Sequence, residues 1–309
     1  MLGSVLLSAS RSPKLRQAVT AFPATRTVVQ RFVAGEQRAD AVRTASALVE
    51  RGLNVTVDHL GEDTTDAAAA AAVKDAYLDV LAAFAEADVA KNVEVSVKLS
   101  AVGQALAKDG EQVSLENARV ICEAAAAVGT TVTFDMEDHT TVDRTLAVVH
   151  ALRPDFPWVG TVLQTMLHRT EADCRDLSGV GSRVRLVKGA YKEPESVAFQ
   201  AKADVDKAYV RCLEVLMAGQ GYPMVASHDP RLISIAATLA EKHGRARDDY
   251  EFQMLFGVRP DEQRRLADDG YKVRVYVPYG TDWYGYFMRR LAERPANVAF
   301  LLRALASKG

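Results

Sequence analysis

Cysteine is scarce in this chain, and the three that occur, Cys122, Cys174 and Cys212, are isolated from one another. They form no CxxC pair and no framework of the kind that holds small secreted domains together. No uninterrupted apolar run approaches the roughly 20 residues that a membrane-spanning helix needs. These absences predict a soluble protein from a reducing compartment.

An excess of positive charge is also missing. The 309 residues carry 38 Lys and Arg against 40 Asp and Glu, so the formal net charge is 38 − 40 = −2. Nucleic-acid-binding proteins are usually strongly basic, so we expect no nucleic-acid partner. The chain is 49% hydrophobic, which excludes intrinsic disorder and predicts a sizeable buried core.

Two common site motifs do not occur. No GxGxxG follows the first predicted strand, which disfavours a doubly wound dinucleotide-binding sheet. The six histidines show neither HExxH nor HxH spacing, so we expect no zinc site.

Strand and helix patterns alternate regularly from about residue 39 onward. Short β-branched runs predict eight strands, at Leu53–Asp58, Val93–Leu99, Thr131–Met136, Val159–Leu163, Val184–Lys188, Met224–Ser227, Tyr250–Met254 and Val273–Val277. Helical patterns lie near 39–51, 65–90, 115–128, 141–152, 171–177, 203–219, 230–243, 260–269 and 283–306. This alternation predicts parallel βαβ units, and eight of them are typical of a (βα)8 barrel. We therefore predict an α/β fold with one barrel domain at 39–309, preceded by lead-in helices at 1–38.

Polar residues recur at the carboxyl ends of the predicted strands, where barrel enzymes carry their chemistry while the strand interiors fill the core. Lys98 and Lys188 lie within apolar runs, where an unpaired charge would be costly. The cluster Asp135, Glu137 and Asp138 could hold Mg²⁺. Either lysine could instead form a Schiff base, and the basic residues near Gly189 would suit a phosphate-bearing ligand. Residue types alone leave these alternatives open.

The predicted last helix adds a substrate feature. Tyr286, Arg289 and Arg290 are spaced so that the tyrosine and the arginine pair share one helical face. An adjacent arginine pair among aromatic residues is suited to a bidentate grip on a carboxylate. The pattern predicts a small substrate that carries a carboxylate.

An ordered series of motifs from about Arg31 to the end of the chain resembles the proline dehydrogenase family, in its short, monofunctional bacterial form. The motifs are Ser96-Val97-Lys98-Leu99-Ser100, Asp135-Met136-Glu137-Asp138, Val162-Leu163-Gln164, Arg185-Leu186-Val187-Lys188-Gly189-Ala190-Tyr191, Ser227-His228-Asp229, Tyr250-Glu251-Phe252-Gln253-Met254-Leu255, Val275-Tyr276-Val277-Pro278-Tyr279-Gly280 and Tyr286 with Arg289-Arg290. The resemblance implies a distorted TIM-type barrel with FAD as cofactor. It also implies oxidation of L-proline to 1-pyrroline-5-carboxylate, with hydride passing from proline C5 to flavin N5 and electrons passing to a membrane quinone.

The resemblance also assigns roles residue by residue. Asp135 and Arg185 would be catalytic, with Arg185 near flavin N5, and Glu62 would form a gate by pairing with Arg289. The substrate would contact Lys98, Leu255, Tyr276, Tyr286, Arg289 and Arg290. FAD would contact Met136, Gln164, Arg185, Val187, Lys188, Gly189, Ser227 and His228. No metal ligand is implied.

The start of the chain bears on localisation. Residues 1–35 contain no Asp or Glu but five Lys and Arg. We interpret this segment as lead-in helices, with an organellar targeting segment as the weaker alternative. A basic amphipathic segment on an enzyme that reduces a quinone predicts a cytoplasmic protein with peripheral contact at the inner face of the membrane.

Overall fold

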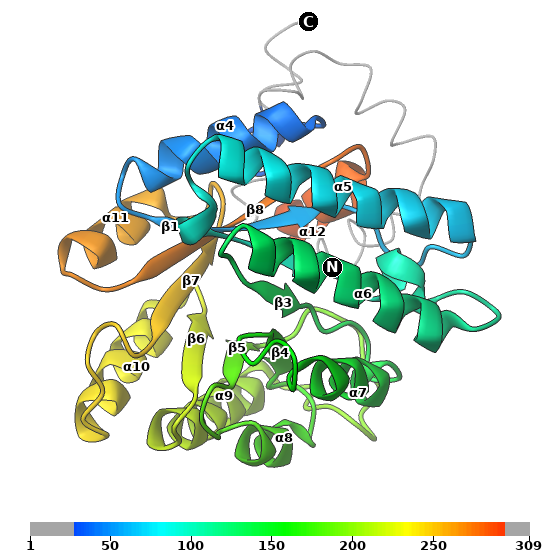
Figure 1. Cartoon of the computed structure of the whole chain (residues 1–309). Helices are drawn as coiled ribbons and strands as arrows, with labels where there is room; N and C mark the ends of the chain where they lie inside the picture. The colour runs from blue at the N-terminus through cyan, green and yellow to red at the C-terminus, as the bar shows by residue number, and fades with distance from the viewer. Residues whose placement is uncertain (1–27, 294–309) are drawn as a thin grey trace, which may run out of the picture.

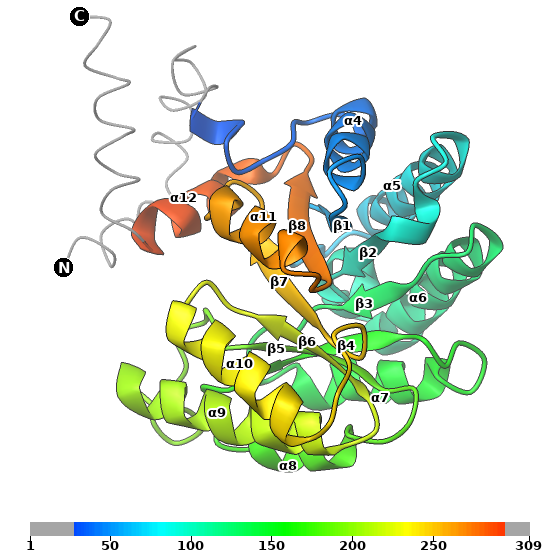
Figure 2. The same cartoon turned by 90° about the vertical axis from the view of Figure 1, so that its left-hand side faces the viewer.

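The computed structural model describes residues 28–293, and its centre is a closed barrel of eight parallel strands. The strands follow one another around the barrel in sequence order, and β1 closes the ring by pairing with β8. The helices lie on the outside (Figures 1 and 2). The predicted TIM-type (βα)8 barrel is therefore confirmed.

Each predicted strand is present, with shifts of a few residues at the ends. The strands are β1 (Asn54–His59), β2 (Val93–Val97), β3 (Val132–Phe134), β4 (Gly160–Gln164), β5 (Arg183–Val187), β6 (Tyr222–Ala226), β7 (Glu251–Leu255) and β8 (Val273–Tyr279). The helices are α4 (Arg38–Val49), α5 (Ala67–Glu86), α6 (Gly110–Ala127), α7 (Val142–Leu152), α8 (Thr170–Asp176), α9 (Lys202–Ala218), α10 (Pro230–Lys242), α11 (Pro260–Asp268) and α12 (Trp283–Glu293). Two short turns, η1 (Ala90–Asn92) and η2 (Ser100–Gln104), complete the described elements.

Local sequence explains how the longer helices begin and what they bury. The side chain of Asp66 caps α5 by accepting a hydrogen bond from the backbone N–H of Ala69 at 2.8 Å. The alanine run that follows has high helix propensity, and the later turns bury Tyr77, Leu81 and Phe84 against the sheet. The amphipathic pattern therefore positions this helix on the apolar outer face of the barrel.

The strands have two chemically different faces. On β2, Val93, Val95 and Val97 face outward and belong to the apolar core between sheet and helices. Glu94 alternates with them and pairs with Arg183 of β5, which is not a neighbouring strand. A contact between these strands must cross the inside of the barrel. The expectation that strand interiors fill the barrel with core residues is thus wrong for the inner faces, which carry buried charges.

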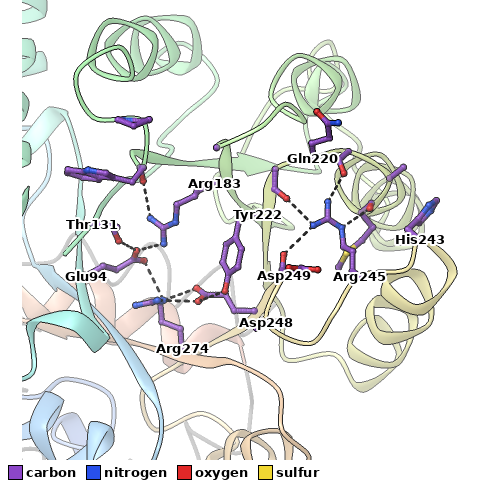
Figure 3. A pocket seen from close by; sticks show the side chains of 18 of the residues that line it. Glu94, Thr131, Arg183, Gln220, Tyr222, His243, Arg245, Asp248, Asp249 and Arg274 are labelled. Carbon is purple, nitrogen blue, oxygen red and sulfur yellow. Dashed lines mark hydrogen bonds and ion pairs between the residues drawn. The ribbon is translucent and has the colours of Figure 1, made fainter. Parts of the chain in front are cut away.

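The two mouths of the barrel differ. The predicted site residues gather at the carboxyl ends of the strands. The opposite mouth holds a cavity of about 870 Å³, into which Glu94, Arg183, Tyr222 and Arg274 project (Figure 3).

The predicted ends of the chain are only partly described. Most of the segment 1–38, predicted to form lead-in helices, lies outside the described residues, so the domain boundary stays a prediction. Residues 28–33 pack against α12, with Phe32 and Phe287 in one apolar cluster. The helix predicted to begin near 115 starts instead at Gly110, and η2 was not predicted. The helix predicted to run to 306 is described as far as Glu293.

Candidate active site

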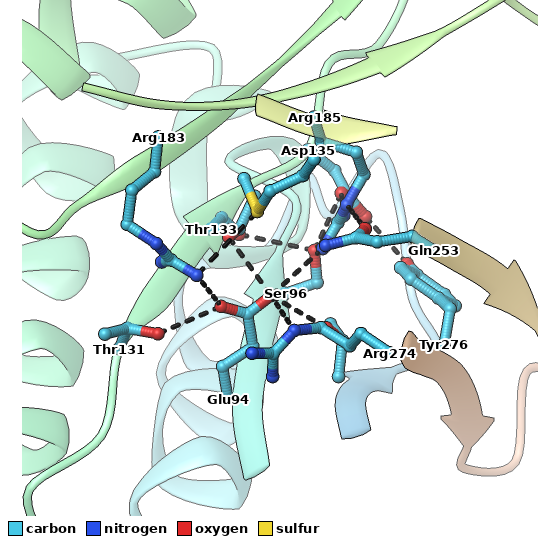
Figure 4. A network of polar contacts seen from close by, with 12 residues as sticks. Glu94, Ser96, Thr131, Thr133, Asp135, Arg183, Arg185, Gln253, Arg274 and Tyr276 are labelled. Carbon is cyan, nitrogen blue, oxygen red and sulfur yellow. Dashed lines mark hydrogen bonds and ion pairs between the residues drawn. The ribbon is translucent and has the colours of Figure 1, made fainter. Parts of the chain in front are cut away.

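The carboxylate of Asp135, directly beyond β3, is the centre of the candidate site. Three groups donate hydrogen bonds to it: the hydroxyl of Ser96 at 2.7 Å, Nη1 of Arg185 at 2.6 Å and the hydroxyl of Tyr276 at 2.7 Å. The donors come from β2, β5 and β8, so barrel closure brings them together (Figure 4). Such bonds to an ionised acceptor are short and strong, and they hold the carboxylate in one orientation.

Arg185 is the most highly bonded cation of the site. Its side chain is 4% exposed, and Nε donates to the side-chain oxygen of Gln253 at 2.5 Å. Nη1 also donates to the hydroxyl of Ser96 at 2.9 Å, and Nη2 donates to Glu94 at 3.3 Å. The guanidinium lies 5.3 Å from the ring centroid of Tyr276. Its position is therefore determined from several strands at once.

Lys98 lies between two carboxylates. Its ammonium donates to Asp58 at 2.9 Å and lies 3.8 Å from Asp135. Burial alone would lower the pKa of Lys98, but the charges of Asp58 and Asp135 outweigh it and hold the pKa above its ordinary value. Lys98 is therefore a fixed cation at neutral pH, which does not favour its use as an amine nucleophile.

Helix α12 supplies the arginine pair. Arg289 is one-third exposed, and its Nη1 donates to the carboxylate of Glu62 at 3.3 Å. Arg290 is buried, with its guanidinium 5.0 Å from the ring centroid of Tyr286. The ion pair between Glu62 and Arg289 that the resemblance implies is present, and its action as a gate stays a prediction.

Tyr191 lies beyond β5 and has a perturbed phenol. Burial raises the pKa of Tyr191, and the charges of Glu137 and Glu62 raise it further, while those of Lys98 and Arg289 lower it.

Comparison with known proteins identifies the family. The family model for proline dehydrogenase matches residues 41–303. The chain belongs to the proline dehydrogenase family. It is 39% identical to proline dehydrogenase 1 of Bacillus subtilis over 308 residues, which cover all of both chains. It is 42% identical to proline dehydrogenase of Deinococcus radiodurans over 280 residues, or 90% of each chain.

A solved structure agrees with the fold. The crystal structure of proline utilization A (PutA) from Bdellovibrio bacteriovorus superposes with a TM-score of 0.79 at 26% identity. The match covers 86% of this chain and 32% of the PutA chain.

Membership of the proline dehydrogenase family determines the class of activity. The protein is an oxidoreductase of proline catabolism that acts on a CH–NH group, and it is a flavoprotein of the monofunctional type. The Schiff-base chemistry that the residue types left open is therefore not the activity of this family. Among residues 28–293, no helix is both long enough and apolar enough to cross a bilayer.

The residues predicted to hold the flavin of this proline dehydrogenase lie at the ends of β3 to β6, and their chemistry fits such a group. Val187, Lys188 and Gly189 are partly exposed in one segment beyond β5. Gly189 has a φ of +106°, a backbone conformation that favours glycine, and a Cβ there would collide with the side chain of Met166. Lys188 contacts Asp206 at 2.5 Å and Asp229 at 3.4 Å.

The remaining predicted cofactor residues lie nearby with defined partners. Gln164, at the end of β4, donates to the backbone carbonyl of Glu137 at 2.6 Å. His228 accepts a hydrogen bond at Nε2 from the backbone N–H of Leu255 at 2.9 Å, which joins a predicted cofactor residue to a predicted substrate residue. Ser227 and Met136 are buried at the same mouth.

The acidic cluster after β3 does not form a metal centre. Glu137 accepts bonds from the backbone N–H of Ser100 at 3.1 Å and from its hydroxyl at 2.6 Å, whereas Asp138 accepts from Thr140. Ser100 and Thr140, the partners of Glu137 and Asp138, are different residues from those that donate hydrogen bonds to Asp135. Within the described residues no group of three or more His, Cys, Asp or Glu could hold a metal ion.

Sequence reasoning assigned no role to several residues of this network, namely Asp58, Glu94, Ser96 and Gln253. The missed signal was period-two alternation within the strands, as in Val93-Glu94-Val95-Ser96-Val97-Lys98. One face of such a strand is apolar and the other is polar. A polar inner face in a closed barrel implies paired charges inside it.

Proposed function

We propose that the protein is an FAD-dependent proline dehydrogenase that oxidises L-proline to 1-pyrroline-5-carboxylate. The observation that supports this proposal is that Glu62, which pairs with Arg289 of α12, follows β1 at the barrel mouth where Lys98, Asp135 and Arg185 form their network. FAD, when bound, would supply at N5 the two-electron acceptor for hydride from proline C5.

Arg289 and Arg290 would bind the proline carboxylate, with Lys98 in the same pocket. A guanidinium binds a carboxylate through two parallel hydrogen bonds, which fixes direction as well as position. The pyrrolidine ring would then lie against Tyr276, Tyr286 and Leu255. Holding the ring from its carboxylate end orients the opposite carbon, C5, toward the acceptor.

The same cations act on the substrate amine. Oxidation requires the neutral amine, and nearby positive charges disfavour the ammonium form. Nη1 of Arg185 lies 2.6 Å from the carboxylate of Asp135, so each fixes the position of the other. Held in this way, the two residues would orient Tyr276 and the reacting groups. Pairing of Glu62 with Arg289 would close the mouth and exclude water.

FAD would contact Met136, Gln164, Arg185, Val187, Lys188, Gly189, Ser227 and His228. Arg185 would lie near flavin N5, and Lys188 would interact with a phosphate or with the ribityl chain. The basic side chains in this set suit the charge of a dinucleotide. Because Asp206 and Asp229 already hold Lys188, its ammonium would be positioned before the cofactor binds.

We further propose a membrane quinone as electron acceptor and a cytoplasmic location, with peripheral contact at the inner face of the membrane. The acid-free residues 1–35 support such contact by their charge, and most of them lie outside the described residues. Binding to anionic and to neutral vesicles, with and without this segment, tests the proposal. Equal, negligible binding in all cases would contradict it.

A visible spectrum of the purified protein tests the function. We expect flavin absorption bands that bleach on anaerobic addition of L-proline and return with a quinone. Bands that persist would contradict proline oxidation. The cofactor released by denaturation should have the mass of FAD, and release of FMN would overturn that assignment alone. The Arg290→Met variant is the matched control, because it should keep its flavin and bleach only at higher proline concentrations.

A further inference from the structure

A continuous series of ion pairs runs through the inside of the barrel. Its members are four acids, Asp58, Glu94, Asp135 and Glu251, and four bases, Lys98, Arg183, Arg185 and Arg274. The formal charge of this set is therefore 4 − 4 = 0. The series begins at Lys98 in the predicted substrate site and ends at the cavity in the opposite mouth. Its stretch from Asp135 to the cavity is shown in Figures 3 and 4.

Glu94 lies where three of the cations meet. Its side chain is 1% exposed, and its oxygens lie 2.7 Å from Arg183, 3.3 Å from Arg185 and 3.8 Å from Arg274. The hydroxyls of Thr56 and Thr131 donate to the same carboxylate at 2.7 and 2.9 Å. Burial would raise the pKa of Glu94, but the three arginines outweigh it and hold the pKa below its ordinary value. The carboxylate is therefore ionised.

The other carboxylate beside these arginines is already engaged. Glu251 accepts from Nε of Arg274 at 2.7 Å and from the side-chain amide of Gln253 at 2.5 Å. Without Glu94, the buried guanidinium of Arg185 and the mostly buried guanidinium groups of Arg183 and Arg274 would face one another with too little negative charge between them. An uncompensated buried charge is costly, and the structure relieves that cost by moving side chains.

The two outer arginines have room to adjust, because both line the cavity. Arg185 does not line the cavity. It lies between Glu94, on the side of the cavity, and Asp135, on the side of the predicted substrate site. A shift of Arg185 would therefore move its bonds to Asp135, Ser96 and Gln253, on which the catalytic face depends.

We propose that Glu94 is a positioning residue for proline oxidation. It anchors Arg185 from the side opposite the substrate, and through Arg185 it fixes the orientation of Asp135. This inference rests on the proposed roles of Arg185 and Asp135 at the site. Glu94 itself reaches neither substrate nor cofactor, since it opens onto the cavity at the other mouth.

The Glu94→Gln variant tests the proposal first. We expect kcat to fall by about tenfold or more while KM for proline changes less than about threefold, because the arginine pair on α12 is untouched. Asp248→Asn is the matched control. Asp248 lines the same cavity and is exposed, and its charge has no part in the ion-pair series, so kcat should not change.

Chemical rescue provides a readout that a general packing defect would not produce. In Glu94→Ala, the cavity leads from solvent to the vacated carboxylate position, so formate can enter. We expect formate to raise kcat saturably in this variant, at saturating proline, and not in wild type or in Asp248→Asn. The absence of rescue in a folded protein, together with wild-type kcat in Glu94→Gln, would overturn the proposal.

Two further variants keep the outcomes distinguishable. If Glu94→Gln does not fold, the double variant Glu94→Gln with Arg183→Gln restores equal numbers of acids and bases. Its kcat should stay about fivefold or more below that of Arg183→Gln alone, and equal values would refute the proposal.

Arg185→Gln tests the proposed function separately. A wild-type kcat in Arg185→Gln would contradict the proposed role of Arg185. A low kcat in Arg185→Gln together with a normal kcat in Glu94→Gln would contradict only the role of Glu94.

Discussion

Replacing Asp135 by Asn should impair turnover strongly without unfolding the protein. The change is nearly isosteric, but it removes the charge that receives three hydrogen bonds, from Ser96, Arg185 and Tyr276. It also introduces an amide N–H2 that must point at one of these donors. Flavin content should stay near that of wild type, because none of the three donors depends on Asp135 alone for its place in a strand.

The structure sets the magnitude. A hydrogen bond to a charged group contributes about 1.5–3 kcal/mol and a neutral one about 0.5–1.5 kcal/mol, so each of the three bonds loses about 1 kcal/mol. Their sum of about 3 kcal/mol, at 1.4 kcal/mol per decade, corresponds to a fall of about 100-fold in kcat/KM. The 100-fold fall is the value expected when all three hydrogen bonds act in the transition state.

Steady-state oxidation of proline with an artificial electron acceptor measures the effect, with flavin absorbance and thermal unfolding recorded in parallel. Asp138→Asn is the control, because it makes the same chemical change three residues away, at a carboxylate that accepts from Thr140 instead. A folded, flavin-loaded Asp135→Asn protein with kcat/KM within about threefold of wild type would refute the reasoning.

Three further predictions follow from neighbouring contacts. Replacing Arg289 or Arg290 by Met should raise KM for proline by about tenfold to a thousandfold, since each removes a charge-assisted pair of about 1.5–3 kcal/mol or more, and loss of flavin instead would contradict a substrate role. Glu62→Ala removes the 3.3 Å pair with Arg289 and should mainly alter closure, seen as a changed KM and faster exchange of water into the site; unchanged kinetics would remove the gate. Burial lowers the pKa of His59 below its ordinary 6.5, so its neutral form stabilises the fold above about pH 6.5 and that stability is lost as the pH falls. The free energy of unfolding in urea should therefore drop between about pH 7.5 and about pH 5.5, and less so in His59→Phe, which keeps the edge contact with Tyr279; equal pH dependence would argue against this role.

More of the predicted cofactor site than of the charged barrel interior could be predicted from the sequence. The segments ending in Gln164, Gly189 and His228 are contiguous motifs, each at the end of a predicted strand, and the structure brings them to one mouth of the barrel. Glu94 and Arg274 belong to no such motif. Their importance arises only where strands that are far apart in sequence face one another.

The chain by itself determined the eight strands, the helices between them and the family, because these depend on local periodicity and on ordered motifs. Alternation along β2 even encodes which side chains face inward. Only the tertiary structure decided which partner each charge meets. Glu94 and Arg183 are 89 residues apart and lie on strands that do not pair, so their contact depends on closure of the barrel and on its register. The near-zero net charge of the chain says nothing of this arrangement, in which four acids and four bases balance inside the barrel because none of them can be buried alone.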